Sequence, residues 1–233
     1  PGADPRRAMR LAGSWGMVPK RDAFLLDRAG YEGGDDWAAG GGKYLSELSG
    51  GLSASLGELP GLGAGKDFVS IDPDTTEDFG DAVFVRESPD NPGGFEASVV
   101  LACPAWNWPV GSAFDKQVLR RSSSLYLPEG DFYMLPRRLC LESYSLRAGA
   151  ERPVMLLNFT LDNDLNLLRA VPELGRMAVS ANLSLAQCEA ALAGDADEAS
   201  AAHAPMLKCA LELAQGLRRK RIENGAVITE RPD

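Results

Sequence analysis

Histidine and cysteine are both scarce in this sequence. A single histidine, His203, would have to serve any Ser-His-Asp or Cys-His arrangement, and no GxSxG motif marks a nucleophile, so we interpret His203 as structural or exposed. The cysteines are widely spaced and form no CxxC pair, which argues against a zinc site and against a disulfide framework. We therefore expect free thiols in a reducing compartment at Cys103, Cys140, Cys188 and Cys209.

Long apolar runs are absent as well. No run of about 18 apolar residues is available to span a bilayer. The N-terminal sequence PGADPRRAMRLAGSWGMVPK has no apolar core of the signal-peptide type. It begins without methionine, which we interpret as a fragment or a processed product that could follow a targeting segment. These features predict a soluble compartment, either the cytoplasm or an organellar matrix or stroma.

Basic residues are also few relative to acidic ones. The net charge is −9 and the pI is about 4.8. The chain therefore lacks the global basic surface with which a stand-alone nucleic-acid-binding protein neutralises phosphates. Two local exceptions, RRSSS at residues 120–124 and RRKR at residues 218–221, are more typical of solvated helix ends than of phosphate sites.

The composition of the chain changes near residue 66. Residues 1–66 are rich in Gly, Ala and Ser, with weak helical periodicity around KYLSELSGGLSASL, and predict an arm or linker with short helices. From residue 67 onward, β-branched runs bounded by turn residues predict strands at 67–71, 82–85, 95–102 and 176–183, a hairpin over 153–171, and a strand starting at 226–229.

Helix-capping signals predict three helices in the same region. The first covers residues 111–124 with Ser112 as its N-cap, and the second covers 184–194 between the caps Ser184 and Gly194. The third is one long amphipathic helix over residues 197–225, acidic at its start and basic at its end.

A cluster of acidic residues lies between two of the predicted strands, in SIDPDTTEDFGDAVFV at residues 70–85. An EF-hand loop starting at Asp72 would require Gly at Glu77 and Glu at Val83, so the EF-hand interpretation fails. Two interpretations remain: a solvated acidic turn, or a site for a divalent cation such as Mg²⁺, which would offset the repulsion between carboxylates at a strand entrance. The five acidic residues are Asp72, Asp74, Glu77, Asp78 and Asp81.

The stretch DFVSIDPDTTEDFGDAVFV resembles the signature of the RNB catalytic domain of the ribonuclease II and ribonuclease R family. The resemblance continues through PVGSAFDKQVLRRSSSLYLPEGDFYMLPRRL, SLRAGAERPVMLLNFTLD and RRKRIENGAVITERPD, in the family's order. It implies that residues 67–233 form the first half of an RNB domain, with an α/β (α+β) fold whose antiparallel-rich mixed sheet has helices packed against it. Family members are magnesium-dependent 3′→5′ exoribonucleases that degrade single-stranded RNA to nucleoside monophosphates.

The resemblance also implies roles for individual residues. Asp72 and Asp81 match metal-binding aspartates, which would hold Mg²⁺ or Mn²⁺ on the scissile phosphate, and Asp78 matches a supporting catalytic aspartate. Tyr126, in the LYLP motif, matches a tyrosine that contacts the RNA end. Single-stranded RNA is therefore the implied substrate.

Gly80 interrupts the family pattern, because it stands where the family has a catalytic aspartate. The strand that ends in an aspartate in the family ends here at Cys103. We therefore expect a catalytically impaired homologue, without a metal if the site is lost, that serves as an RNA-associated or structural subunit of a larger nucleoprotein or organellar assembly. Two alternatives stay open: an active exoribonuclease in which Glu77 replaces the lost carboxylate, and an α/β domain that binds neither RNA nor metal.

Overall fold

The computed structural model describes residues 11, 14–17, 41–127 and 130–227. The chain divides into two compact units, the first from Pro1–Ser55 and Ala105–Tyr144 and the second from Leu56–Pro104 and Ser145–Asp233. The boundary predicted at residue 66 separates two continuous stretches of sequence, whereas each of these units combines two separate stretches. The predicted boundary is therefore not tested by this division and stays a prediction.

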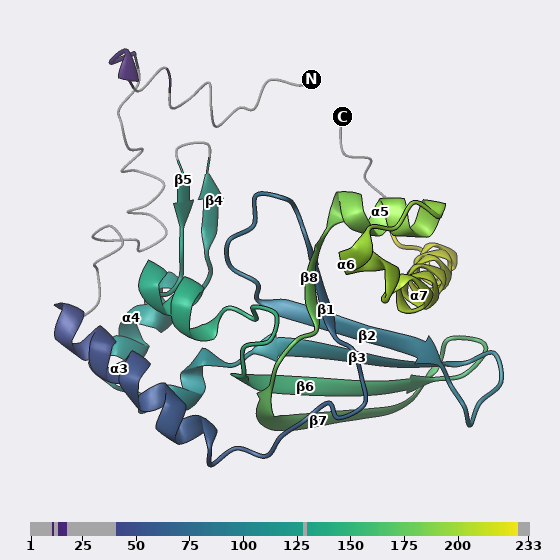
Figure 1. The fold of residues 1–233 in the computed structure, drawn as a ribbon, viewed down its shortest axis with the longest axis horizontal. Helices are drawn as coiled ribbons and strands as arrows, with labels where there is room; N and C mark the ends of the chain where they lie inside the picture. The colour runs from purple at the N-terminus through teal and green to yellow at the C-terminus, as the bar shows by residue number, and fades with distance from the viewer. Residues whose placement is uncertain (1–10, 12–13, 18–40, 128–129, 228–233) are drawn as a thin grey trace. The chain divides into compact units, whose positions relative to one another are not determined.

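The second unit is built on a six-stranded sheet with the strand order β7-β6-β3-β2-β1-β8 (Figure 1). Neighbouring strands are antiparallel except β1 and β8, which are parallel. This sheet confirms the expected mixed α/β class with a predominantly antiparallel sheet. The strand bounds are β1 (Val69–Asp72), β2 (Asp81–Glu87), β3 (Phe95–Ala102), β6 (Arg152–Leu161), β7 (Leu167–Met177) and β8 (Ala181–Ser184).

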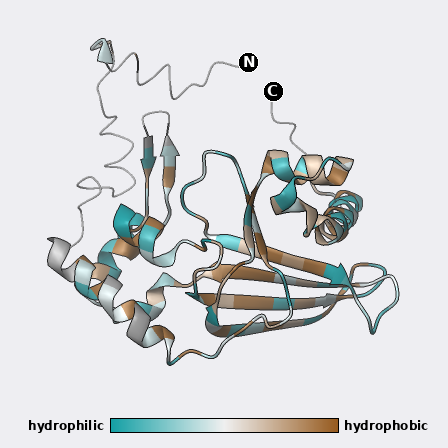
Figure 2. Ribbon diagram, viewed as in Figure 1, coloured by the Kyte–Doolittle hydropathy of each residue, from teal (hydrophilic) through white to brown (hydrophobic). Residues whose placement is uncertain are grey.

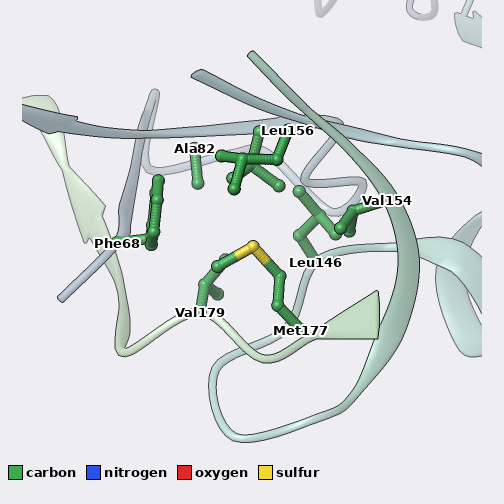
Figure 3. Packing of buried hydrophobic residues seen from close by; sticks show 8 residues of the cluster. Phe68, Ala82, Leu146, Val154, Leu156, Met177 and Val179 are labelled. Atoms are coloured by element: carbon green, nitrogen blue, oxygen red, sulfur yellow. The ribbon is translucent and has the colours of Figure 1, made fainter. Parts of the chain in front are cut away.

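The sheet buries apolar side chains on both faces, and its central strands are correspondingly apolar (Figure 2). Because successive side chains of a strand point to opposite faces, Ala82 and Val85 of β2 belong to different cores. On the face of Ala82, connecting segments and the end of β7 supply the cover, and Figure 3 shows Phe68, Leu146, Met177 and Val179 pointing toward Ala82 and Leu156. On the face of Val85, the cover is a helix that contributes Leu213.

Three helices follow β8 in the second unit: α5 (Leu185–Ala193), α6 (Glu198–Ala201) and α7 (Ala204–Glu223). The predicted caps of α5 are confirmed, because the Ser184 side chain accepts from Gln187 N and Gly194 adopts the left-handed conformation. The single helix predicted over residues 197–225 is wrong. The first segment ends at Ala201, and a new helix begins after its N-cap His203, with Pro205, which has no amide hydrogen, in its first turn. His203 is buried, as a structural histidine would be.

The strand predicted over residues 176–183 is also divided. Arg176 and Met177 complete β7, and β8 begins only at Ala181. Between them the backbone turns to other partners: Ser180 N donates to Phe68 O at 2.7 Å, and Gly149 N donates to Val179 O at 3.0 Å. The strand predicted from residue 226 is not present at Ala226 and Val227, and its remainder lies outside the described residues.

The first unit contains the helix α3 (Gly41–Leu56), which ends just inside the second unit, and a small apolar core around Trp108. The ring centroids of Trp108 and Phe114 are 5.0 Å apart in an edge-to-face arrangement, and Trp108 Nε1 donates to Asp115 Oδ1 at 3.0 Å. The predicted N-cap Ser112 is confirmed, since its side chain accepts from Asp115 N. The other elements are the 3₁₀-helix η1 (Pro104–Asn107), α4 (Ala113–Arg121), β4 (Leu125–Leu127), β5 (Gly130–Phe132) and the π-helix η2 (Leu139–Tyr144).

The cysteines behave as the sequence indicates, but the expectation that the first basic run is a solvated helix end is wrong for Arg121. Cys103, Cys140, Cys188 and Cys209 are free thiols. Arg121, from the first basic run, is buried and its guanidinium donates to Tyr133 O at 3.0 Å, which is a structural contact. In the part of the chain that the structure describes, no helix is long and apolar enough to cross a bilayer.

Candidate active site

Asp72 is the last residue of β1 and is half-buried. Its strand lies between β2 and β8, where Asp72 pairs with Ser184 in the parallel ladder. Burial raises the pKa of the Asp72 carboxyl above its usual value, a hydrogen bond from the Ser70 side chain lowers it, and the charge of Asp81 raises it again. The negative charge of Asp81 therefore acts on the Asp72 carboxyl.

Asp81 is the first residue of β2 and is exposed. Its partner in the next strand is Leu101, which is also exposed. Asp78 lies half-buried in the loop between β1 and β2, and Glu77 beside it is exposed. The structure thus brings Asp72 and Asp81 together electrostatically, and it places Asp78 in the loop that joins their strands.

Gly80 immediately precedes β2, and its carbonyl accepts a hydrogen bond from Ala102 N at 2.9 Å. In the antiparallel pairing of β1 with β2, Val69 lies opposite Val83; continued to the strand ends, this register would bring Gly80 opposite Asp72. A β-carbon added at Gly80 would meet no atom within 4 Å, and Gly80 does not have the positive φ that favours glycine. Neither packing nor backbone conformation therefore requires glycine at this position.

The acidic loop is held in place by residues 145–148, which we call the strap. Phe79, between Asp78 and Gly80, donates its amide to Ser145 Oγ at 2.9 Å and accepts from Leu146 N at 2.8 Å. The Arg147 guanidinium donates to Glu77 O at 3.0 Å and lies 5.7 Å from the Phe79 ring centroid. These contacts fix the backbone of the loop without using its carboxylates.

The carboxylate oxygens of the acidic cluster are the type of donor that a hard divalent cation prefers, although few of them are available. Mg²⁺ is commonly bound by one or two carboxylates, with water and substrate phosphates in its other positions, and Asp72 and Asp81 are the two carboxylates whose charges interact here. Within residues 41–127 and 130–227, however, no group of three or more His, Cys, Asp or Glu side chains could hold a metal ion. The residues present therefore fit a two-carboxylate site that depends on its ligand for the rest of the coordination.

Two further positions from the sequence can be located. Tyr126 lies on β4 of the first unit, opposite Asp131 of β5, and the residue is 60% exposed. Cys103 follows the end of β3 as a half-buried free thiol, and its amide donates to Pro153 O at 2.9 Å. Asp72, Asp78 and Asp81 belong to the second unit.

Two cavities in the second unit were not foreseen from the sequence. One, of about 280 Å³, is lined by polar residues that include Lys66, Ser98 and Asn158. The other, of about 420 Å³, is almost wholly aliphatic and lies between α7 and the sheet. Neither cavity is lined by the acidic cluster.

Comparison with known proteins identifies relatives of the chain. The model of the RNB domain matches residues 64–233, well over half of the chain. A curated relative, exoribonuclease 2 of Escherichia coli, is 41% identical over 98 residues, which are 42% of this chain and 15% of the relative. The chain therefore spans only a small part of the length of the curated relatives that it matches.

Solved structures show the same fold. RNase R of Mycoplasma genitalium, in complex with ribose methylated single-stranded RNA, has a TM-score of 0.67 at 21% identity, over 98% of this chain and 33% of that chain. Yeast Ssd1, a pseudonuclease, has a TM-score of 0.58 at 21% identity, over 73% of this chain and 20% of that chain. With the domain match over residues 64–233, these findings establish that the chain belongs to the RNB domain family.

Proposed function

We propose that this chain is an RNA-associated member of the RNB family whose capacity to hydrolyse RNA is strongly reduced. The observation that carries the proposal is Gly80. Its neighbours Asp72 and Asp81 are retained and interact, but the position that the family gives to an aspartate has no side chain. The available relatives are exoribonucleases, one of them solved with single-stranded RNA, and the pseudonuclease Ssd1 has the same fold.

The retained carboxylates define what the site would still do. A bound Mg²⁺ or Mn²⁺ would supply Lewis-acid stabilisation of the scissile phosphate. Asp72 and Asp81 would hold the cation, and Asp78 would support them from the loop. Without a carboxylate at position 80, one ligand or water-orienting group is missing, which we expect to slow hydrolysis on the order of a thousandfold, or about 4 kcal/mol of transition-state stabilisation.

Tyr126 would bind RNA in this proposal, because an exposed aromatic ring offers a stacking surface to an unpaired base. The acidic chain provides little electrostatic attraction for RNA by itself, since its net charge is −9. We therefore propose that it works within a larger assembly whose other components supply the basic surface.

A second candidate is an active 3′→5′ exoribonuclease. It is favoured by the exposed carboxylate of Glu77, which lies in the same loop as Asp78. In this case Glu77 would take the place of the lost aspartate. Glu77→Ala would then abolish hydrolysis, whereas it would leave an impaired protein unchanged.

The test is to incubate the full chain with end-labelled single-stranded RNA and Mg²⁺ or Mn²⁺, and to measure RNA binding by fluorescence anisotropy in parallel. We expect binding with little or no shortening of the RNA. A ladder of shortened products that Asp81→Asn abolishes would overturn the proposed impairment. Absence of both binding and hydrolysis would instead favour an α/β domain without an RNA-related function.

A further inference from the structure

Asn182 of β8 occupies a position from which it contacts both sides of the candidate site. Its Nδ2 donates to Ser70 Oγ at 2.9 Å and to Leu146 O at 2.8 Å, and its Oδ1 accepts from Ala148 N at 2.8 Å. One half-buried side chain thus joins β1 to the strap. No signal in the local sequence marks this residue, which follows Ala181 in an ordinary strand.

Ser70 and Leu146, two of the residues that Asn182 contacts, lie beside different parts of the acidic cluster. Ser70, which is 1% exposed, precedes Asp72 by two residues on β1, so the two side chains lie on the same face of the strand. Leu146 belongs to the strap, whose backbone and Ser145 hydroxyl hold Phe79 between Asp78 and Gly80. The path from Asp72 to the acidic loop therefore runs through Asn182.

We infer that Asn182 is a positioning residue, which fixes the spacing between Asp72 and the loop that carries Asp78 and leads into Asp81. The inference rests on the proposed function for the use of these carboxylates, but the contacts themselves do not depend on it. An amide side chain suits this role because it donates twice and accepts at the same time, so it can tie a hydroxyl, a carbonyl and an amide together. Such supporting hydrogen bonds orient ligand side chains in metal sites generally.

Asn158 provides a matched control in the same sheet. It is also half-buried, and it makes a comparable set of hydrogen bonds: its Oδ1 accepts from Lys66 Nζ at 3.0 Å and from Ser98 Oγ at 2.7 Å, while its Nδ2 donates to Glu173 at 2.7 Å. None of these partners touches the acidic cluster. Asn158→Ala should therefore lower stability as Asn182→Ala does, without changing the site.

The experiment compares the full chain with its Asn182→Ala and Asn158→Ala variants. Hydrogen exchange of the Phe79 amide is measured alongside thermal stability and the affinity for Mn²⁺. We expect faster Phe79 exchange and Mn²⁺ affinity lower by about 10- to 100-fold in Asn182→Ala only. Equal Phe79 exchange and equal Mn²⁺ affinity in both variants would overturn the inference.

Two further outcomes are separable. If the wild-type chain binds no Mn²⁺, the metal site of the proposed function is wrong, and Phe79 exchange alone decides whether Asn182 positions the loop. If Asn182→Ala does not fold, Asn182→Asp replaces it, since this variant keeps the oxygen that accepts from Ala148 N and removes the two hydrogen bonds that Asn182 donates. Unchanged Phe79 exchange in Asn182→Asp would then contradict the inference.

Discussion

Gly175 lies so close to Pro60 that a β-carbon on the glycine would come within 2.6 Å of the Pro60 carbonyl oxygen. The same oxygen accepts a hydrogen bond from Arg176 N at 2.9 Å, and Leu62 N donates to Arg176 O at 2.9 Å. The segment before β1 is therefore docked along β7, although its composition alone suggests a loose connection.

Gly175→Ala is expected to destabilise the second unit, because the added methyl group meets backbone that cannot rotate away. Overpacking of this kind costs typically about 1–3 kcal/mol. Chemical denaturation measures the change in the free energy of unfolding. Gly61→Ala is the control, since a β-carbon there meets nothing within 4 Å; equal stability of the two variants would show that the segment is not docked at Gly175.

Gly80→Asp should fold normally, because the position has room for a side chain and an ordinary backbone conformation. The new carboxylate is expected to strengthen Mn²⁺ binding and to increase RNA hydrolysis by about a thousandfold if the loss is confined to this residue. Titration calorimetry and the labelled-RNA assay provide the measurements. Gly80→Ala controls for the loss of glycine alone. A folded but inactive Gly80→Asp variant would mean that further groups, such as the one replaced by Cys103, have been lost.

Asp72→Asn is expected to stabilise the metal-free protein at neutral pH. Burial raises the pKa of Asp72, so the folded state favours the protonated form. The stability contributed by this group is complete below its usual pKa of 3.8 and is lost as the pH rises through the higher folded-state pKa. Since the group is partly solvated, we expect a rise in Tm of less than about 4 °C at pH 7, the shift that 1 kcal/mol produces at this size.

Thermal unfolding at pH 7 and pH 3 checks this expectation. The advantage of Asp72→Asn should vanish at the lower pH, where the wild-type carboxyl is also neutral. Asp74→Asn, an exposed position in the same loop, should leave Tm nearly unchanged at both values. A Tm difference between Asp72→Asn and wild type that is independent of pH would contradict the assignment.

Asp197 has the opposite pH dependence. Hydrogen bonds from the Ser200 side chain, the Gln187 side chain and the Ser200 backbone lower its pKa from 3.8 to about 2. Its contribution to stability is therefore present above its usual pKa and is lost as the pH falls through about 2. Asp197→Ala should lower Tm at pH 7 but not below pH 2, whereas the exposed Asp195→Ala should have little effect at either pH. A Tm deficit that persists in acid would show that the charge is not responsible.

The local elements of this fold could be read from the sequence. Ser112, Ser184 and Gly194 mark helix ends by interactions within a few residues, and the structure places them as predicted. The break at His203 could also have been found, because Pro205 is a local signal. The division of the strand at Val179 could not, since it depends on hydrogen bonds to Phe68 and Gly149, which are distant in the sequence.

The candidate site shows the same limit. Asp72, Asp78 and Asp81 are recognisable because they fall in one short motif, and their roles stay predictions. Asn182 and Ser145 are far from that motif in the sequence, and their contacts arise only when β8 and the strap pack beside β1. A single polar residue in a strand has many structural explanations, so spacing alone could not have selected either of them.

The parallel pairing of β1 with β8 has a consequence for biosynthesis. Val69 pairs with Ala181, which is far along the chain. During synthesis, β1 is therefore made well before its parallel partner β8. Closing so long a loop is entropically costly and slow. Until then the nascent chain presents an open strand edge, which is a natural substrate for chaperones and a starting point for aggregation.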